Sequence, residues 1–215
     1  MSSVKLSVTS KLGVKSWSLQ ALETCPGSIG DNGELVPACS GCYATAGTYH
    51  YANVKKVRAD NKEAWKMNTF VSDFVEALQN ERYFRWFDSG DMYTLELAEK
   101  MYTIMLQTPW VNHWVPTRMQ KFSKFADIIA KMNALDNVKV RFSSDSVTGE
   151  YTNGLHGSTI LPSADNADMN TFVCKAPENE GKCGTCRACY DKNVNLIGYI
   201  AHGVKMKKVI RIATA

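Results

Sequence analysis

The sequence lacks any long apolar run and any leader-like start. Its longest apolar stretches are far shorter than the roughly 20 residues that a membrane-spanning helix needs. Residues 1–15 mix Lys5, Lys11 and Lys15 with Ser and Thr, so they have no apolar core of a signal peptide. We therefore expect no membrane contact and a cytoplasmic location, a reducing compartment in which disulfides are rare.

Common catalytic motifs are also missing. There is no P-loop, dinucleotide fingerprint, Gly-x-Ser-x-Gly elbow or His-Glu-x-x-His motif. The four histidines form no ligand pair such as His-x3-His, and we expect His113, flanked by Trp114, to be a core residue. The net charge is only +4, and the basic run Lys205–Lys208 has no interleaved aromatic residues. This pattern favours a solvated face and leaves nucleic-acid binding as a weakly supported alternative.

What the sequence does contain is an alternation of strand-like and helix-like segments. Short segments rich in β-branched and aromatic residues predict four strands, at residues 83–87, 111–115, 138–142 and 171–173. Apolar residues with helical spacing predict three helices, at residues 71–78, 97–105 and 125–132. Ser123 is expected to cap the last of these helices.

The spacing of these segments indicates the fold class. The first three strands begin about 28 residues apart, which is the size of a βα unit. We therefore expect an α/β fold with a parallel sheet and right-handed crossovers. A closed eight-stranded barrel takes about 250 residues, so this chain predicts a partial, open βα barrel over residues 1–170. Residues 171–215 would add a cysteine-rich segment and a C-terminal strand to the same domain.

Polar side chains follow three of the predicted strands directly. The carboxyl ends of parallel strands meet at one edge of a sheet, where ligands bind in α/β folds. Alternatively, these residues are simply turn and N-cap residues. The candidate ligand-binding residues at this edge are Ser89, Gly90, Asp91, Thr117, Arg118, Ser143, Ser144 and Asp145.

Three of the seven cysteines lie in a Gly/Pro-rich loop near the N-terminus. Cys25, Cys39 and Cys42 are spaced C-x13-C-x2-C. Glycine lets backbone N–H groups approach sulfur closely. Three thiolates can hold three irons of a cubane cluster and leave the fourth iron open. We therefore expect an iron–sulfur site in residues 25–42.

The other four cysteines lie near the C-terminus. Cys174, Cys183, Cys186 and Cys189 are spaced C-x8-C-x2-C-x2-C, which resembles part of the bacterial ferredoxin run. Tetrahedral zinc sites also use C-x2-C knuckles, so zinc is the alternative here. Zinc ribbons usually separate two knuckles by a dozen or more residues, and we therefore favour a second cluster.

The order of these motifs is similar to that of a bacteriophage family known as gene product 88, over about residues 18–192. The resemblance rests on Cys-Pro-Gly…Cys-Ser-Gly-Cys-Tyr-Ala, Phe-Arg-Trp-Phe-Asp-Ser-Gly-Asp-Met, Trp-Val-Pro-Thr-Arg, Val-Arg-Phe-Ser-Ser-Asp-Ser and the closing four-cysteine tract. Members of that family look like truncated radical S-adenosylmethionine (SAM) proteins. If a phage encodes the chain, its location would be the host cytoplasm.

The resemblance to radical SAM proteins implies a cofactor and an activity. Cys25, Cys39 and Cys42 would hold a [4Fe–4S] cluster whose open iron binds SAM, and the C-terminal cysteines would hold an auxiliary cluster. The segment Ser89–Asp91 takes the place of the motif that contacts the SAM amine. Asp91 would meet that amine and Arg118 the SAM carboxylate. Alternatively, Asp91 and Arg118 form a salt bridge that braces neighbouring strands.

Three functions therefore stay open. The first is an enzyme that uses a cluster with an open iron, with SAM as a candidate ligand, a reductant partner and an unknown substrate. The second is a non-catalytic iron–sulfur protein with a redox or structural role. The third is a zinc-stabilised nucleic-acid-binding protein.

Overall fold

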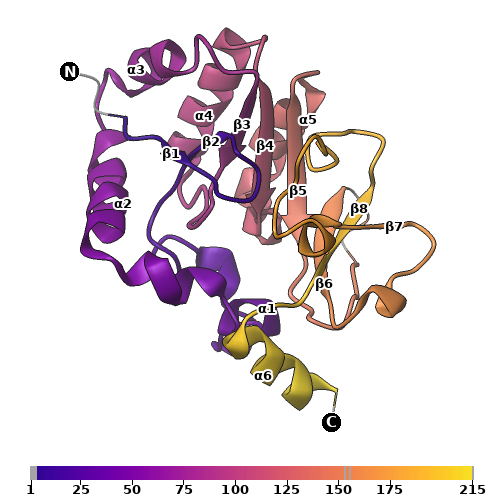
Figure 1. Cartoon of the computed structure of the whole chain (residues 1–215). Helices are drawn as coiled ribbons and strands as arrows, with labels where there is room; N and C mark the ends of the chain where they lie inside the picture. The colour runs from indigo at the N-terminus through magenta and orange to yellow at the C-terminus, as the bar shows by residue number, and fades with distance from the viewer. Residues whose placement is uncertain (1–3, 153, 155, 215) are drawn as a thin grey trace.

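The computed structural model describes residues 4–152, 154 and 156–214. A single mostly parallel sheet runs through it (Figure 1). Its strands are, in spatial order, β1 (Ser7–Val8), β2 (Lys15–Trp17), β3 (Tyr83–Trp86), β4 (Asn112–Thr117), β5 (Val138–Ser143), β6 (Gly157–Leu161), β8 (Leu196–Ile200) and β7 (Thr171–Val173). Only β1 is antiparallel to its neighbour. The sheet confirms the expected α/β class, while the partial barrel stays a prediction.

The connections β3–β4 and β4–β5 each contain one helix, as expected of βα units, and the described residues contain six α-helices. They are α1 (Pro37–Ser40), α2 (Ala52–Ala64), α3 (Phe70–Ala77), α4 (Leu95–Gln107), α5 (Ala126–Ala134) and α6 (Val204–Ala213). The three helices predicted from apolar spacing correspond to α3, α4 and α5. The expected cap of α5 is wrong, because Ser123 begins a 3₁₀ turn that ends at Phe125, and Phe125 then precedes the helix without a side-chain cap.

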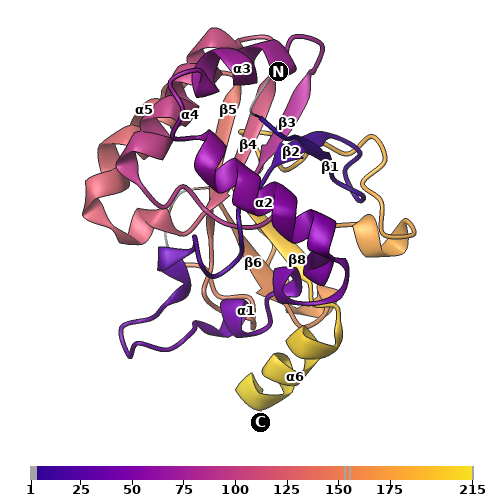
Figure 2. The ribbon, with the colours of Figure 1, turned by 90° about the vertical axis from the view of Figure 1, so that its left-hand side faces the viewer.

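Helices α3, α4 and α5 cover one face of the sheet, which we call the helix face (Figure 2). Alternate strand residues such as Phe84, Trp86 and Val140 point to this face and are fully buried. Phe74 of α3 stacks on Trp86 with ring centroids 4.8 Å apart, and Trp17 of β2 joins the same cluster. This aromatic core fixes the register of the first three parallel strands against the helices.

The opposite face of the sheet is covered by residues 174–195, which we call the C-terminal tract. Arg85, Trp114 and Arg141 alternate with the residues of the helix face, and they point toward the tract. We call this side the tract face. Strands from residues 1–170 and from residues 171–215 therefore belong to one sheet. The predicted boundary at residue 170 stays a prediction.

Three strands, β1, β2 and β6, were not expected from the sequence, whereas β8 lies within residues 171–215, where a C-terminal strand was expected. β6 pairs with β5, and β8 lies between β6 and β7. The predicted strand 171–173 is therefore an edge strand rather than the neighbour of β5. β6 contains Gly157 and Ser158, which have weak strand preference, so its pattern is hard to detect.

Candidate functional site

The carboxyl ends of β3 and β4 are joined by Asp91. One carboxylate oxygen of Asp91 accepts hydrogen bonds from the Thr117 hydroxyl at 2.7 Å and from the Met92 N–H at 2.8 Å. The other oxygen accepts from the Arg118 N–H at 2.8 Å. Burial raises the pKa of Asp91, although these donors favour the carboxylate. Both oxygens of Asp91 are therefore engaged by the chain itself.

The carboxyl ends of β4 and β5 are joined by the guanidinium of Arg118. Its Nε lies 3.2 Å from the Asp145 carboxylate, and its Nη2 donates to the Ser144 carbonyl at 2.8 Å. Lys121 pairs with the same carboxylate. The ion pair of Arg118 at this edge is thus with Asp145, and Asp91 binds the main chain of Arg118 instead.

The predicted serine and glycine residues at this edge are anchors for other loops. Ser89 donates to the Leu19 carbonyl at 2.6 Å, and Ser144 donates to the Glu150 carbonyl at 2.6 Å. Gly90 has a φ of 84°, and a Cβ there would lie 2.6 Å from the Cβ of Leu19. Ser143 is the half-buried last residue of β5. The edge is therefore tightly tied within the chain.

The loop that carries Cys25, Cys39 and Cys42 lies across these strand ends. Gly27 packs directly on Arg118, so that a Cβ at residue 27 would be 2.5 Å from the Cβ of Arg118. Lys121 donates to the Gly27 carbonyl at 2.9 Å, and the Ala38 N–H donates to the Asp145 carbonyl at 3.0 Å. The hydroxyl of Tyr43 donates to the Asp88 carbonyl at 2.7 Å. The loop thus contacts the segments after β3, β4 and β5.

The three thiols of this loop lie near one another. Burial and the nearby Asp91, Cys39 and Cys42 together raise the pKa of Cys25 to about 12. Burial also raises the pKa of Cys39, whereas the neighbouring Arg118 lowers it. Such thiols stay protonated unless a metal or a cation stabilises the thiolate. The cations that follow β4 are in place to supply part of that stabilisation.

The four C-terminal cysteines lie on the tract face. The Cys174 N–H donates to the Gly198 carbonyl of β8 at 2.9 Å, and the Cys183 N–H donates to the Lys11 carbonyl at 2.8 Å. The Sγ of Cys189 lies 3.4 Å from the Tyr199 hydroxyl. The tract is thus fixed to β8 and to the turn before β2.

Electrostatic coupling shows that these thiols also form a group. Burial raises the pKa of Cys183, and Cys174 and Cys186 raise it further. Burial raises the pKa of Cys189 to about 11, while its hydrogen bond with Tyr199 lowers it. The thiols of Cys174, Cys183 and Cys186 therefore lie near one another, and the role of the cysteines as cluster ligands stays a prediction.

Neither group resembles a site for a single metal ion. Among the described residues, no three or more Cys, His, Asp or Glu side chains are arranged so that they could hold one ion. In an iron–sulfur cubane each thiolate binds a different iron, so its ligands need not converge on one point. Buried donors beside the C-terminal cysteines also lack partners in the described part of the chain: Trp114 Nε1, Arg85 Nε, Arg187 Nε and the Tyr190 hydroxyl. Donors that lack protein acceptors fit a ligand rich in sulfur acceptors.

Sequence reasoning missed the charged residues of the tract face. Arg141 is fully buried, and its guanidinium donates to carbonyls of Ala188, Cys189, Asp191 and Val194. The signal was present in Val138–Phe142, where Lys and Arg alternate with apolar residues. In a strand buried on both faces, this alternation predicts a polar second face.

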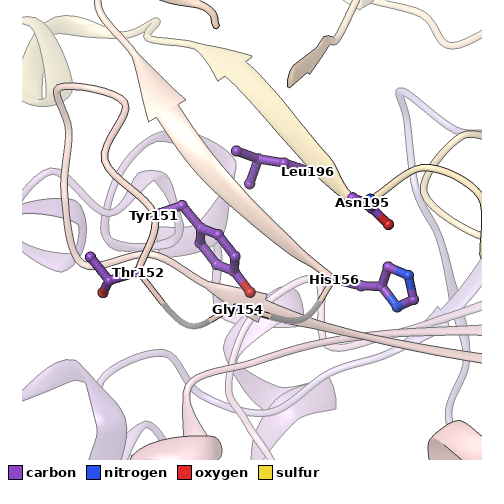
Figure 3. A pocket seen from close by; sticks show the side chains of 6 residues that line it. All are labelled: Tyr151, Thr152, Gly154, His156, Asn195 and Leu196. Atoms are coloured by element: carbon purple, nitrogen blue, oxygen red, sulfur yellow. The ribbon is translucent and has the colours of Figure 1, made fainter. Parts of the chain in front are cut away.

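One cavity adjoins the N-terminal thiol loop, and another lies away from both thiol groups. The first has a volume of about 300 Å³, and its lining includes Pro37, which belongs to the same helix α1 as Cys39, and Asp145. The second, of about 340 Å³, lies where β6 and β8 begin, which is the amino end of these parallel strands (Figure 3). It is lined by Tyr151, Thr152, Gly154, His156, Asn195 and Leu196. It contains none of the residues predicted to bind a ligand.

Within the described ranges, no helix has the length and apolar character to cross a membrane.

Comparison with known proteins identifies a family but no function. No curated protein and no solved structure matches the chain. The model of the family described as "Gene product 88" matches residues 3–192, a range that includes all seven cysteines and the strand ends. The likeness to radical SAM proteins has no support from these comparisons and stays a prediction. Because the match covers most of its length, the chain belongs to the gene product 88 family.

Proposed function

We propose that this protein is an iron–sulfur protein with two [4Fe–4S] sites, one open and one closed. The observation that carries the proposal is the separation of all seven thiols into two groups, each with mutual electrostatic coupling and nearby cations. Buried thiols with raised pKa values are poor ligands until a metal displaces their protons. Loading with iron and sulfide would therefore release protons and stabilise the fold.

In the open site, Cys25, Cys39 and Cys42 would hold three irons and leave the fourth iron for an exogenous ligand. Arg118 lowers the pKa of Cys39 and would offset the negative charge of the thiolates. The residues nearest to an exogenous ligand would be Lys121 and Asp145, whose side chains keep 27% and 39% exposure. These two groups offer a cation and an anion at the loop.

In the closed site, four thiolates would saturate a cluster and leave no iron for substrate. This site suits storage or transfer of electrons and a structural role. It would also tie the tract to β8 and to the turn before β2, so that loading couples to folding. An external one-electron reductant would supply the electrons.

SAM is the candidate ligand of the open site, and with it the protein would be an enzyme. Two features support this reading: the thiol loop follows β2, the first parallel strand, and it contacts the segments after β3, β4 and β5. The role expected for Asp91 needs revision, because both of its carboxylate oxygens already accept bonds from the chain. Asp145 is also paired, with Arg118 and Lys121, but its side chain is 39% exposed; the amine of an amino-acid ligand would replace Lys121 at Asp145, and the ligand carboxylate would then meet the released Lys121.

Anaerobic purification with quantification of iron, sulfide and zinc tests this proposal. We expect a brown protein with iron and sulfide in equal amounts, and we expect Cys39→Ala and Cys186→Ala each to lose about half of the iron. Paramagnetic resonance spectra of the reduced protein with and without SAM should differ, and Asp145→Asn should reduce the difference. A colourless protein with stoichiometric zinc would contradict the iron–sulfur proposal. An unchanged spectrum on addition of SAM would leave the redox or structural role.

A further inference from the structure

The tract face contains a cluster of aromatic and cationic side chains around the C-terminal cysteines. The guanidinium of Arg85 lies 4.7 Å above the Trp114 ring, and the Tyr190 ring lies 6.0 Å from Trp114. The guanidinium of Arg187 lies 5.0 Å above the Tyr83 ring. This cluster surrounds a part of the tract that would otherwise be a solvated loop.

Four donors in this cluster are buried without a hydrogen-bond partner among the described residues. They are Arg85 Nε, Trp114 Nε1, Arg187 Nε and the Tyr190 hydroxyl. Leaving a buried donor unpaired costs about 1–3 kcal/mol. The other unpaired buried side-chain atoms of the described residues belong to Trp17, Arg58 and Gln120. Native proteins pair nearly all of their buried polar groups, so four unpaired donors in one cluster indicate a missing acceptor there.

Two of the unpaired atoms belong to arginine side chains that are held by hydrogen bonds or ion pairs of their Nη atoms. Arg85 pairs through Nη1 with Asp88 at 3.0 Å and through Nη2 with the Tyr43 hydroxyl at 3.3 Å, which leaves Nε. Arg187 donates through Nη1 to carbonyls of Gly184 and Cys186, which also leaves Nε. The orientation of both side chains is therefore fixed, and an acceptor would meet a preformed donor.

The cysteines are the neighbours that these donors share. Cys183 and Cys189 pack against the same small core as Trp114 and Tyr190. Arg85 lowers the pKa of Cys189, and Arg187 lowers that of Cys183. The positive charges thus act on the thiols that would become thiolates.

We propose that Arg85, Trp114, Arg187 and Tyr190 form a donor cage for the sulfur atoms of a cluster bound to the C-terminal tract. Cluster sulfurs are hydrogen-bond acceptors, and each electron added to the cluster increases their negative charge. Donors and guanidinium charges therefore stabilise the reduced form and raise the reduction potential. This inference rests on the proposed iron–sulfur function and adds the residues that set the potential of the closed site.

The test removes single donors while it keeps an aromatic ring at each position. Trp114→Phe removes the indole N–H, and Tyr190→Phe removes only the hydroxyl. Both are made in a Cys39→Ala background, so that the C-terminal cluster alone contributes to the signal. Trp110→Phe is the matched control, because Trp110 lies in the turn before β4 and its N–H donates to the carbonyl of Leu78 at the end of α3.

The measurement is a redox titration of the full-length protein, followed by paramagnetic resonance. We expect Trp114→Phe and Tyr190→Phe each to lower the midpoint potential. In the double variant, the ratio of reduced to oxidised cluster at fixed potential should fall about tenfold, which corresponds to a decrease of about 59 mV in the midpoint potential for one electron. Trp110→Phe should leave the potential unchanged. Variants with full iron and sulfide and the parent potential would overturn the cage while leaving the iron–sulfur function intact. A parent protein without iron and sulfide would overturn the proposed function itself.

Discussion

Replacement of Arg141 by methionine should detach the C-terminal tract from the sheet. Arg141 is fully buried, and its guanidinium donates four hydrogen bonds of 2.8–2.9 Å to carbonyls of Ala188, Cys189, Asp191 and Val194. Among the described residues, no carboxylate forms an ion pair with Arg141. Its contribution therefore comes from carbonyl dipoles of the tract, which methionine cannot bind.

The size of the effect follows from these bonds. A hydrogen bond from a charged donor contributes about 1.5–3 kcal/mol, and burial of the guanidinium offsets several kcal/mol of the sum. Arg141→Met also leaves carbonyls of the tract without a donor. We expect the free energy of unfolding to fall by about 3–5 kcal/mol, which corresponds to a decrease of about 10 °C in Tm for a chain of this size.

Urea and thermal unfolding of parent and variant, prepared with equal iron content, measure this change. Arg82→Met is the matched control, because Arg82 is exposed and donates only to the neighbouring Glu81 carbonyl. We expect the control to stay within about 0.5 kcal/mol of the parent. If Arg141→Met unfolds like the control, the tract is not held to the sheet by this side chain, and the argument from its four hydrogen bonds is wrong.

Three further predictions test other parts of the structure. Burial, together with Arg141, lowers the pKa of Lys139 from 10.5 to about 7. Above pH 7 the unfolded chain therefore binds more protons than the folded chain, and the free energy of unfolding should rise from pH 7 to 8.5. Urea titrations at several pH values should show this rise in the parent and no such rise in Lys139→Met. Burial lowers the pKa of His113 to about 3, and its Nδ1 accepts a hydrogen bond from the Trp86 N–H at 3.2 Å. Nitrogen-15 spectra at pH 5 should therefore show a neutral His113 ring with its proton on Nε2. A doubly protonated ring at pH 5 would contradict this protonation state. Gly27→Ala cannot fit against Arg118 without a shift of that backbone, so it should lower the iron content of the N-terminal site by about half and leave the C-terminal site loaded, as metal analysis would show.

Local sequence patterns predict those parts of the fold in which pattern and packing agree. The alternation in Tyr83–Trp86 and Val138–Ser143 placed buried strands, and the apolar spacing in Leu95–Gln107 placed a helix. His113 was correctly expected in the core, where Trp86 and Thr108 satisfy its two ring nitrogens. Cysteine spacing separated two groups of thiols. These signals are local, so a single chain reveals them.

Tertiary structure alone decided what the polar residues at the strand ends do. Asp91 and Arg118 carry the residue types that a ligand site needs, yet their partners are the main chain of β4 and the Asp145 carboxylate. No sequence pattern distinguishes a carboxylate that waits for a ligand from one that ties two strands together. The difference lies in donors that come from another strand 26 or 27 residues away.

Tertiary structure also decided what lies on the second face of the sheet. The tract reaches Arg141 across 47 to 53 residues of chain, and Arg85 meets Trp114 from a neighbouring strand. These contacts depend on the order of β6, β8 and β7, which the sequence does not indicate because β6 is weakly strand-like and the crossovers are long. Cysteine spacing thus determined which thiols belong together, whereas the pairing of distant strands determined which cations and unpaired donors surround them.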